Sequence, residues 1–319
     1  MLCAFLITSL RPTGPYWLLA LSGEQGSGKS VFSKAVRALV DPNAAPARAP
    51  AKDEEVLVLA ACNGWLLAYD NVSRLSGDLS DALCRLATGG GFGRRKLQTH
   101  GEWLSDVCRP VLLNGIPELT NRADLGDRAL ALSLPPIGSR KRQTEAAFWE
   151  AFEQARPRIL GALYDAVAMG LRRQGDLPPL RFPRMADAAR FACAAAPALG
   201  LNEDQMLMIL ERNARVTAAV SLESWVLLQP LLALLDQSYG TWSGTPTQLL
   251  TELGTRAPEG AKRSKSWPCD ATRLGGQLRR HAPGLRKIGI SVVRDRCGER
   301  RTIIIKRLEG QDGDEGDPE

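Results

Sequence analysis

The sequence predicts an α/β fold, a parallel sheet with helices on both faces, followed by an all-α bundle and a small winged-helix domain. Three observations predict it. Residues 1–138 alternate short apolar strand patterns with helical ones, which is typical of a parallel sheet. Residues 139–240 carry apolar side chains at helical spacing. Residues 241–308 contain helix patterns followed by two alternating strands, and the acidic, glycine-rich residues 309–319 are expected to be a disordered tail.

The first part is expected to contain four strands. The strand Tyr16–Leu21 leads into a glycine-rich loop, and the helix Val31–Val40 follows that loop. A further helix is expected at Leu79–Leu86, and a loop at residues 41–52, which are rich in Pro and Ala. The apolar start, Met1–Leu10, is too short to span a membrane and is expected to be a helix end packed on the core. The remaining strands are expected at Trp65–Tyr69, Val111–Leu113 and Ala129–Leu134.

The later parts have patterns of their own. The bundle is expected to contain the helices Ala146–Leu171 and Met206–Val220. In the C-terminal part, a helix around Gln248–Leu253 precedes a second helix that begins near Asp270. Two strands follow, at Ile288–Val293 and Thr302–Lys306. A polar turn, Arg294–Arg301, is expected to join them. Helices followed by a basic hairpin are typical of a winged helix.

The glycine-rich loop has the pattern of a phosphate-binding loop. Its residues are Gly23, Glu24, Gln25, Gly26, Ser27, Gly28, Lys29 and Ser30. The glycines let successive N–H groups converge on phosphate oxygens. Lys29 is expected to reach the β- and γ-phosphates of ATP, and Ser30 to offer its hydroxyl to Mg²⁺. Because the pattern follows an apolar strand and opens a helix, the sequence predicts a P-loop NTPase. The alternative is a merely structural glycine turn.

Two later strands end in polar residues that fit the same chemistry. Asp70 follows the second strand, and an acid there can hold the Mg²⁺ shell; the alternative is a cap of the next turn. Many such ATPases place a Glu after this Asp to polarise the attacking water, and here the neighbour is Asn71. Asn114 ends the third strand and is expected to sense the γ-phosphate, although Asn before Gly115 is also common in ordinary turns.

An arginine just before the fourth strand is the candidate arginine finger. Arg128 would stabilise the charge on the phosphoryl group bound by a neighbouring subunit, and Arg122 is the second choice. The alternative for Arg128 is a surface ion pair with Asp124 or Asp127.

Residues 86–97, which include Thr88-Gly89-Gly90, precede Arg109-Pro110-Val111-Leu112-Leu113-Asn114. Together with the loop and Asp70, this arrangement resembles the superfamily III helicases, especially the motor domains of phage and plasmid primase–helicases. The resemblance covers about residues 10–138. It implies an AAA+-like hexameric ring that moves on single-stranded or forked DNA, with a possible primase domain upstream. It also implies a pore hairpin between Lys96 and Asp106, in which Lys96 and His100 are the expected DNA contacts; the alternative for His100 is an exposed loop histidine with no function.

The positive charge lies near the C-terminus. Residues 262–308 contain fourteen Lys/Arg against three Asp/Glu, which predicts contact with nucleic acid. The expected contacts are Arg273, Arg279 and Arg280 on the second helix and Arg294, Arg296, Arg300 and Arg301 along the turn. The alternatives are a solvated basic surface and a protein-binding winged helix.

The sequence therefore predicts a cytoplasmic, ATP-dependent DNA helicase or translocase from the replication protein of a phage, plasmid or other mobile element, with no membrane partner. The scattered cysteines have no metal-ligand spacing. Two other interpretations stay open. One is an ATP-binding DNA switch, such as a loader or regulator, that does not translocate; the other is a degenerate mobile-element remnant.

Overall fold

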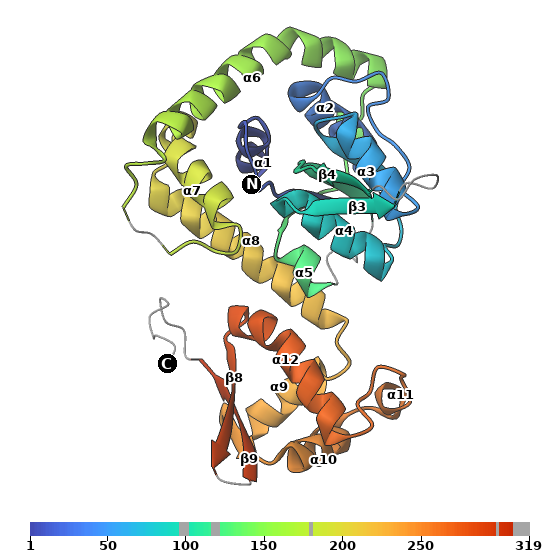
Figure 1. The fold of residues 1–319 in the computed structure, drawn as a ribbon, viewed down its shortest axis with the longest axis vertical. Coiled ribbons are helices and arrows are strands. Elements are labelled where there is room, and N and C mark those ends of the chain that lie inside the picture. The colour runs from blue at the N-terminus through green and yellow to red at the C-terminus, as the bar shows by residue number, and fades with distance from the viewer. Residues whose placement is uncertain (96–101, 116–121, 179–180, 298–299, 309–319) are drawn as a thin grey trace. The chain divides into compact units, whose positions relative to one another are not determined.

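The structure is a computed structural model that describes residues 1–95, 102–115, 122–178, 181–297 and 300–308. The chain divides into two compact units, Met1–Thr217 and Ala218–Glu319 (Figure 1). The first contains a parallel sheet with its helices, and the second contains helices and a small antiparallel sheet. Among the described residues, no single helix is long and apolar enough to cross a membrane; only α8 (Glu203–Glu223) and α9 (Leu228–Gln237) together, bent at the break between them, reach that length.

The first unit is built on a sheet of four parallel strands. Their spatial order is β2 (Leu67–Val72), β5 (Val111–Gly115), β1 (Leu18–Gly23) and β6 (Ala129–Leu134). Alternate side chains belong to two cores: Leu19 and Leu112 to one, Leu18 and Val111 to the other. Burial on both faces explains the nearly continuous apolar runs of these strands. The four expected strands are confirmed, with small shifts at their ends.

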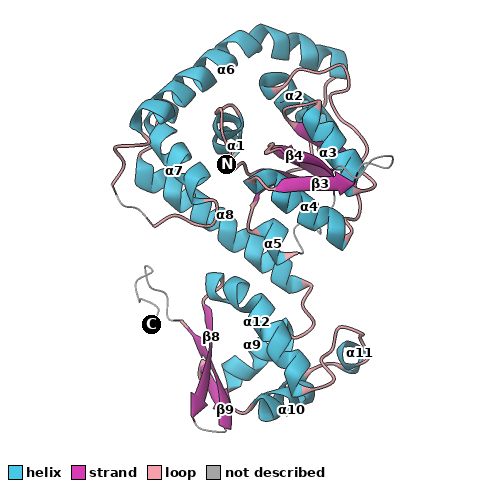
Figure 2. Ribbon diagram, viewed as in Figure 1, coloured by secondary structure: helices cyan, strands magenta, loops and turns pink. Residues whose placement is uncertain are grey.

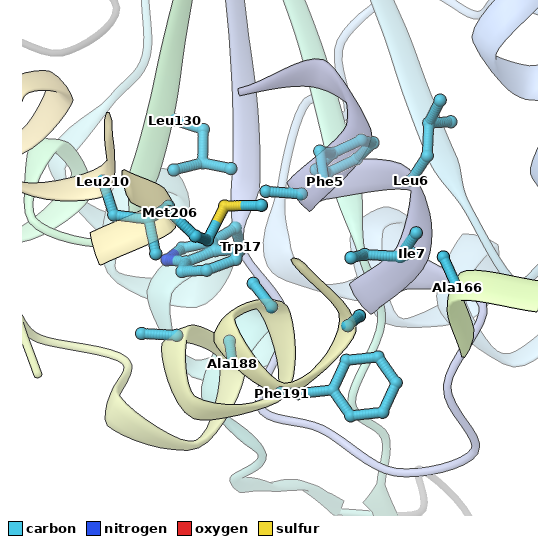
Figure 3. Packing of buried hydrophobic residues seen from close by; sticks show 14 of the residues in the cluster. Phe5, Leu6, Ile7, Trp17, Leu130, Ala166, Ala188, Phe191, Met206 and Leu210 are labelled. Atoms are coloured by element: carbon cyan, nitrogen blue, oxygen red, sulfur yellow. The ribbon is translucent and has the colours of Figure 1, made fainter. Parts of the chain in front are cut away.

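Helices cover both faces of the sheet. Those that share the first core are α1 (Leu2–Ser9), α2 (Lys29–Val40), α6 (Glu145–Arg173), α7 (Ala186–Ala195) and the beginning of α8. Those that share the second core are α3 (Glu54–Cys62), α4 (Gly77–Thr88) and, through Leu125, the short α5 (Ala123–Gly126). In the first core, Met206 and Leu210 of α8 lie next to Trp17 (Figure 3). The expected bundle at 139–240 therefore shares a core with the sheet over much of its length. Two further short elements complete the unit: η2 (Ser139–Lys141) and η3 (Ala196–Leu199).

A hairpin stands between α4 and β5. Its strands, β3 (Gly91–Arg95) and β4 (Glu102–Asp106), pair antiparallel, with Gly91 opposite Asp106. The hairpin expected before the third strand is therefore present and begins at Gly91. The residues between the strands, including Lys96 and His100, lie outside the described residues.

The second unit contains α9 followed by a helix–hairpin arrangement. Its other elements are β7 (Thr241–Gly244), α10 (Pro246–Arg256), α11 (Glu259–Lys262), α12 (Ala271–Lys287), β8 (Ile290–Cys297) and β9 (Arg300–Arg307). The strands form an antiparallel sheet in the order β7-β9-β8. Helices α9 and α12 pack against the hairpin β8–β9 (Figure 2). Leu274, Leu278 and Leu285 of α12 are buried in the core of this unit.

The expected polar turn at Arg294–Arg301 is wrong at both ends. Strand β8 continues to Cys297 and β9 begins at Arg300, because Arg294 pairs with Ile303 and Arg296 with Arg301 across the ladder. Backbone pairing with neighbouring residues holds these polar residues in the strands, although they lack the apolar alternation that marks a half-buried strand.

Candidate nucleotide-binding site

The loop between β1 and α2 has a backbone that its glycines make possible. Gly23, Gly26 and Gly28 have φ angles of 151°, 82° and 78°. A Cβ atom on Gly23 would lie 2.6 Å from the carbonyl oxygen of Leu134, so this position has no room for a side chain. The loop therefore combines the left-handed backbone and the close packing that glycine alone tolerates.

The ammonium group of Lys29 lies within the curve of this loop. Its Nζ donates to the carbonyl oxygens of Gly23 (2.7 Å) and Glu24 (2.8 Å). The hydroxyl of Ser27 also donates to Glu24 O, at 2.8 Å. An anion that enters the loop thus meets a cation and the N-terminus of α2, both of which favour negative charge.

Three expected site residues meet at the carboxyl edge of the sheet. The Oδ1 atom of Asp70 accepts hydrogen bonds from Ser30 Oγ (3.2 Å) and from Asn114 Nδ2. Asn114 is 2% exposed, and its Oδ1 has no hydrogen-bond partner among the described residues. A hydroxyl, a carboxylate and a free amide oxygen are hard oxygen ligands of the kind that Mg²⁺ accepts directly or through water. These residues therefore fit a magnesium–nucleotide complex.

A bulge in β2 directs Asp70 toward the loop. The pairing of β2 with β5 shifts register between Tyr69 and Val72. Asn71, inside the bulge, has φ 60°, and its backbone N–H donates to Asp70 Oδ1 at 2.9 Å. Asn adopts this left-handed backbone more readily than Glu, which gives a physical reason for the absence of a Glu at this position. Bulges commonly redirect a side chain beside a functional site.

Tyr69 adds no charge beside Asp70. Burial raises the pKa of Tyr69 to about 12, against smaller lowering effects of Arg48 and Arg37. The phenol is therefore neutral at physiological pH, and the carboxylate of Asp70 supplies the negative charge at the end of β2.

Arg128 lies at the opposite edge of the sheet from the loop. Its carbonyl accepts from Leu18 N at 3.0 Å, and the next residue, Ala129, pairs with Leu18, whereas Leu134 pairs with Gly23. Five residues of strand correspond to about 16 Å. The structure therefore does not bring Arg128 to the loop of its own chain.

Both candidates for the arginine finger, Arg128 and Arg122, contact neighbouring groups of the same chain. Arg128 Nη1 donates to the backbone oxygen of Asp124 at 2.8 Å, and Arg122 pairs with Asp81 at 2.8 Å. Arg184, which sequence reasoning missed, approaches the carboxylates of Asp127 (3.5 Å) and Asp124 (3.9 Å). The expected alternative, a carboxylate pair for Arg128, is thus replaced by a backbone contact to Asp124.

The segment after β6 also reaches the loop, and sequence reasoning missed it. Arg142 Nη2 lies 3.6 Å from the position that a Cβ on Gly26 would take, and Ile137 Cδ1 lies 3.2 Å from the corresponding position on Gly28. The available signal was the basic run Arg140-Lys141-Arg142 directly after the fourth strand.

The expected nucleic-acid contacts occupy several places. Arg273, Arg279 and Arg280 are exposed on α12. Arg294 donates to the carbonyl of Gly275 on α12, so this guanidinium also joins β8 to the helix. Burial, and the nearby charge of Arg279, lower the pKa of Arg294. As a correction to the expected turn, the other three arginines lie on strands: Arg296 on β8, Arg300 and Arg301 on β9.

The fold and the site define an α/β parallel-sheet protein with a candidate phosphate-binding loop and a basic C-terminal unit. The family model of the actinomycete integrative conjugative element replication protein matches residues 1–207, and the model of the AICE RepA C-terminal domain matches residues 227–314. The chain therefore belongs to the replication proteins of actinomycete integrative conjugative elements. The predicted origin in a mobile-element replication protein is confirmed. No curated protein matches the sequence.

Proposed function

We propose that this replication protein is a cytoplasmic, ATP-dependent DNA helicase or translocase. ATP binds to the loop Gly23–Ser30, and Ser30 and Asp70 hold its Mg²⁺. The observation that carries the proposal is the meeting of Ser30, Asp70 and Asn114 beside the loop that contains Lys29. A P-loop, an acid on a neighbouring strand and a polar sensor are the recurring parts of phosphoryl-transfer sites.

A second copy of the chain supplies the finger. Arg128 lies at the end of β6 that is farthest from the loop, about 16 Å away along the strand, so it does not reach the nucleotide of its own chain. A role as arginine finger therefore requires the nucleotide of a neighbouring copy. This placement supports a homo-oligomeric ring, hexameric by the resemblance to superfamily III helicases. Within it, the hairpin β3–β4 and the exposed arginines of α12 bind the DNA backbone, which gives a sequence-independent and salt-sensitive grip.

One observation favours a second function, a nucleotide-dependent DNA switch that does not translocate. Asn71 stands where many ATPases have the Glu that polarises water, and its left-handed backbone disfavours a Glu. In this case ATP binding would change the affinity for DNA, and hydrolysis would be slow.

The test is ATP hydrolysis with and without single-stranded DNA. A motor hydrolyses ATP several-fold faster with DNA, and Lys29→Ala abolishes this activity because it removes the cation in the loop. Lys34→Ala is the matched control: this lysine is on the same helix, pairs with Glu145 at 3.0 Å, and its loss leaves the rate unchanged. If the wild type binds ATP but hydrolyses it no faster than Lys29→Ala, the motor proposal fails and the switch replaces it.

A further inference from the structure

Residues 135–142, in the segment that connects β6 to α6, pack against the loop. Ile137 lies beside Gly28 and Arg142 beside Gly26, at van der Waals distance or slightly closer for an added Cβ. Arg142 Nε donates to the backbone carbonyl oxygen of Ile137 at 3.3 Å, which holds the Arg142 side chain against the backbone of the same segment. A part of the chain remote in sequence from the loop thus forms a second wall beside it.

This wall lines a cavity of about 600 Å³ that is open to solvent, and the residues that line it are exposed. It is lined by Pro135, Pro136, Ile137, Gly138, Arg140 and Lys141. The volume falls in the range of small-molecule sites, and an apolar surface with a few charged groups is their usual lining. The apolar face suits a flat heterocycle, and the two cations suit the polyanion to which that heterocycle is attached.

We infer that residues 135–142 form the second half of the nucleotide site: the cavity holds the base and ribose, and the Arg142 guanidinium binds the phosphate chain held by the loop. This inference rests on the proposed function. Arg142 is suited to the role because a guanidinium presents several donors in a planar fork that matches phosphate oxygens. Its neighbour Gly26 has no side chain between the guanidinium and the loop.

Two probes separate the halves of the site. Tripolyphosphate with Mg²⁺ reports on the loop and Arg142, and ATP with Mg²⁺ adds the base and ribose. By calorimetric titration of the full chain, we expect ATP to bind at least about tenfold more tightly than tripolyphosphate. In Gly138→Leu, the new side chain starts in open space and occupies part of the cavity. The affinity of this variant for ATP should therefore fall toward its affinity for tripolyphosphate, and its affinity for tripolyphosphate should equal that of the wild type. Equal affinity of the wild type for both probes would overturn the assignment of the cavity.

Arg142→Ala tests the phosphate contact. Loss of a charge-assisted hydrogen bond lowers the affinity for both probes by roughly ten- to hundredfold. Arg158→Ala, which removes an exposed arginine of α6, is the control and leaves both affinities unchanged. Unchanged binding in Arg142→Ala would refute the role of Arg142, while the loop proposal would stand if Lys29→Ala still lost binding. Failure of the wild type to bind either probe would refute both proposals together.

Discussion

The carboxylate of Asp41 is expected to be a major support of the first unit. Its Oδ2 accepts from Arg37 Nη2 (3.1 Å) and from the backbone N–H groups of Trp65 and Leu66 (3.0 Å each). The Arg37 side chain is 1% exposed and that of Asp41 20%. Arg37 lies on α2, which begins at Lys29, and Leu66 leads directly into β2, which carries Asp70. One side chain thus joins the two elements that hold the candidate site.

Removing Asp41 should lower the free energy of unfolding more than removing Arg37. Asp41→Ala leaves a buried guanidinium without its counter-charge and two backbone donors without an acceptor, which together cost about 3–5 kcal/mol. The bond from Arg37 Nε to the Asp41 carbonyl oxygen (3.2 Å) survives and keeps the cost within that range. Arg37→Met removes the buried charge and keeps most of the volume, while the carboxylate retains its two backbone donors. We expect about 1–2 kcal/mol for Arg37→Met.

Urea unfolding followed by tryptophan fluorescence measures both costs. With a slope of about 1–3 kcal/mol per M, Asp41→Ala lowers the midpoint of the first unit by more than about 1 M. The double variant Arg37→Met/Asp41→Ala should be more stable than Asp41→Ala alone, because it no longer buries an unpaired charge. If Asp41→Ala costs no more than Arg37→Met, the proposed role of Asp41 as the shared acceptor is refuted.

Two further predictions concern the second unit. Arg279→Ala and Arg280→Ala should each reduce the slope of log K for DNA against log salt by about 0.7–0.9, as measured by titration at several salt concentrations, whereas Arg256→Ala, whose guanidinium pairs with Glu252, should leave it unchanged. His281 stacks on Trp225 at 4.6 Å, and burial, with a smaller effect of Arg280, lowers its pKa below 6.5. As pH falls below about 6.5, the imidazole of His281 takes up a proton in the unfolded chain before it does so in the folded unit, so the unit should lose stability on acidification. His281→Phe should remove that part of the pH dependence of stability. An unchanged pH profile in His281→Phe would contradict this role of His281.

The sequence predicts the central strands and the residues that end them because two regularities coincide there. Parallel strands covered on both faces need unbroken apolar runs, and their carboxyl ends share one edge of the sheet. Asp70 and Asn114 each follow such a run, so the strand pattern alone leads one to expect that they meet near Ser30. The register of the bulge at Asn71 does not follow from that pattern, because it depends on pairing between β2 and β5.

Other features escaped prediction because apolar periodicity does not reveal them. Helix α3 has no clear apolar stripe, and its start is fixed by Asp53, whose side chain accepts from Val56 N at 2.9 Å. Strand β7 has four residues and is held by its pairing with β9. The approach of Arg142 to the loop likewise depends on how the chain leaves β6.

The positions of Arg128 and Asn71 have opposite implications for the proposed function. A lone chain that only binds nucleotide needs no arginine at the far edge of its sheet, and the contact of Arg128 with the Asp124 carbonyl is worth only about 1.5–3 kcal/mol even for a charged donor. Its Nε is buried without a partner among the described residues, a cost that the fold of one chain leaves unexplained. Asn71, by contrast, supplies no carboxylate that could polarise the attacking water in the proposed ATPase. The two observations agree if hydrolysis depends on the neighbouring copy: a site that lacks its own water-polarising Glu relies more strongly on the arginine that a second subunit brings, so assembly rather than nucleotide binding would set the rate.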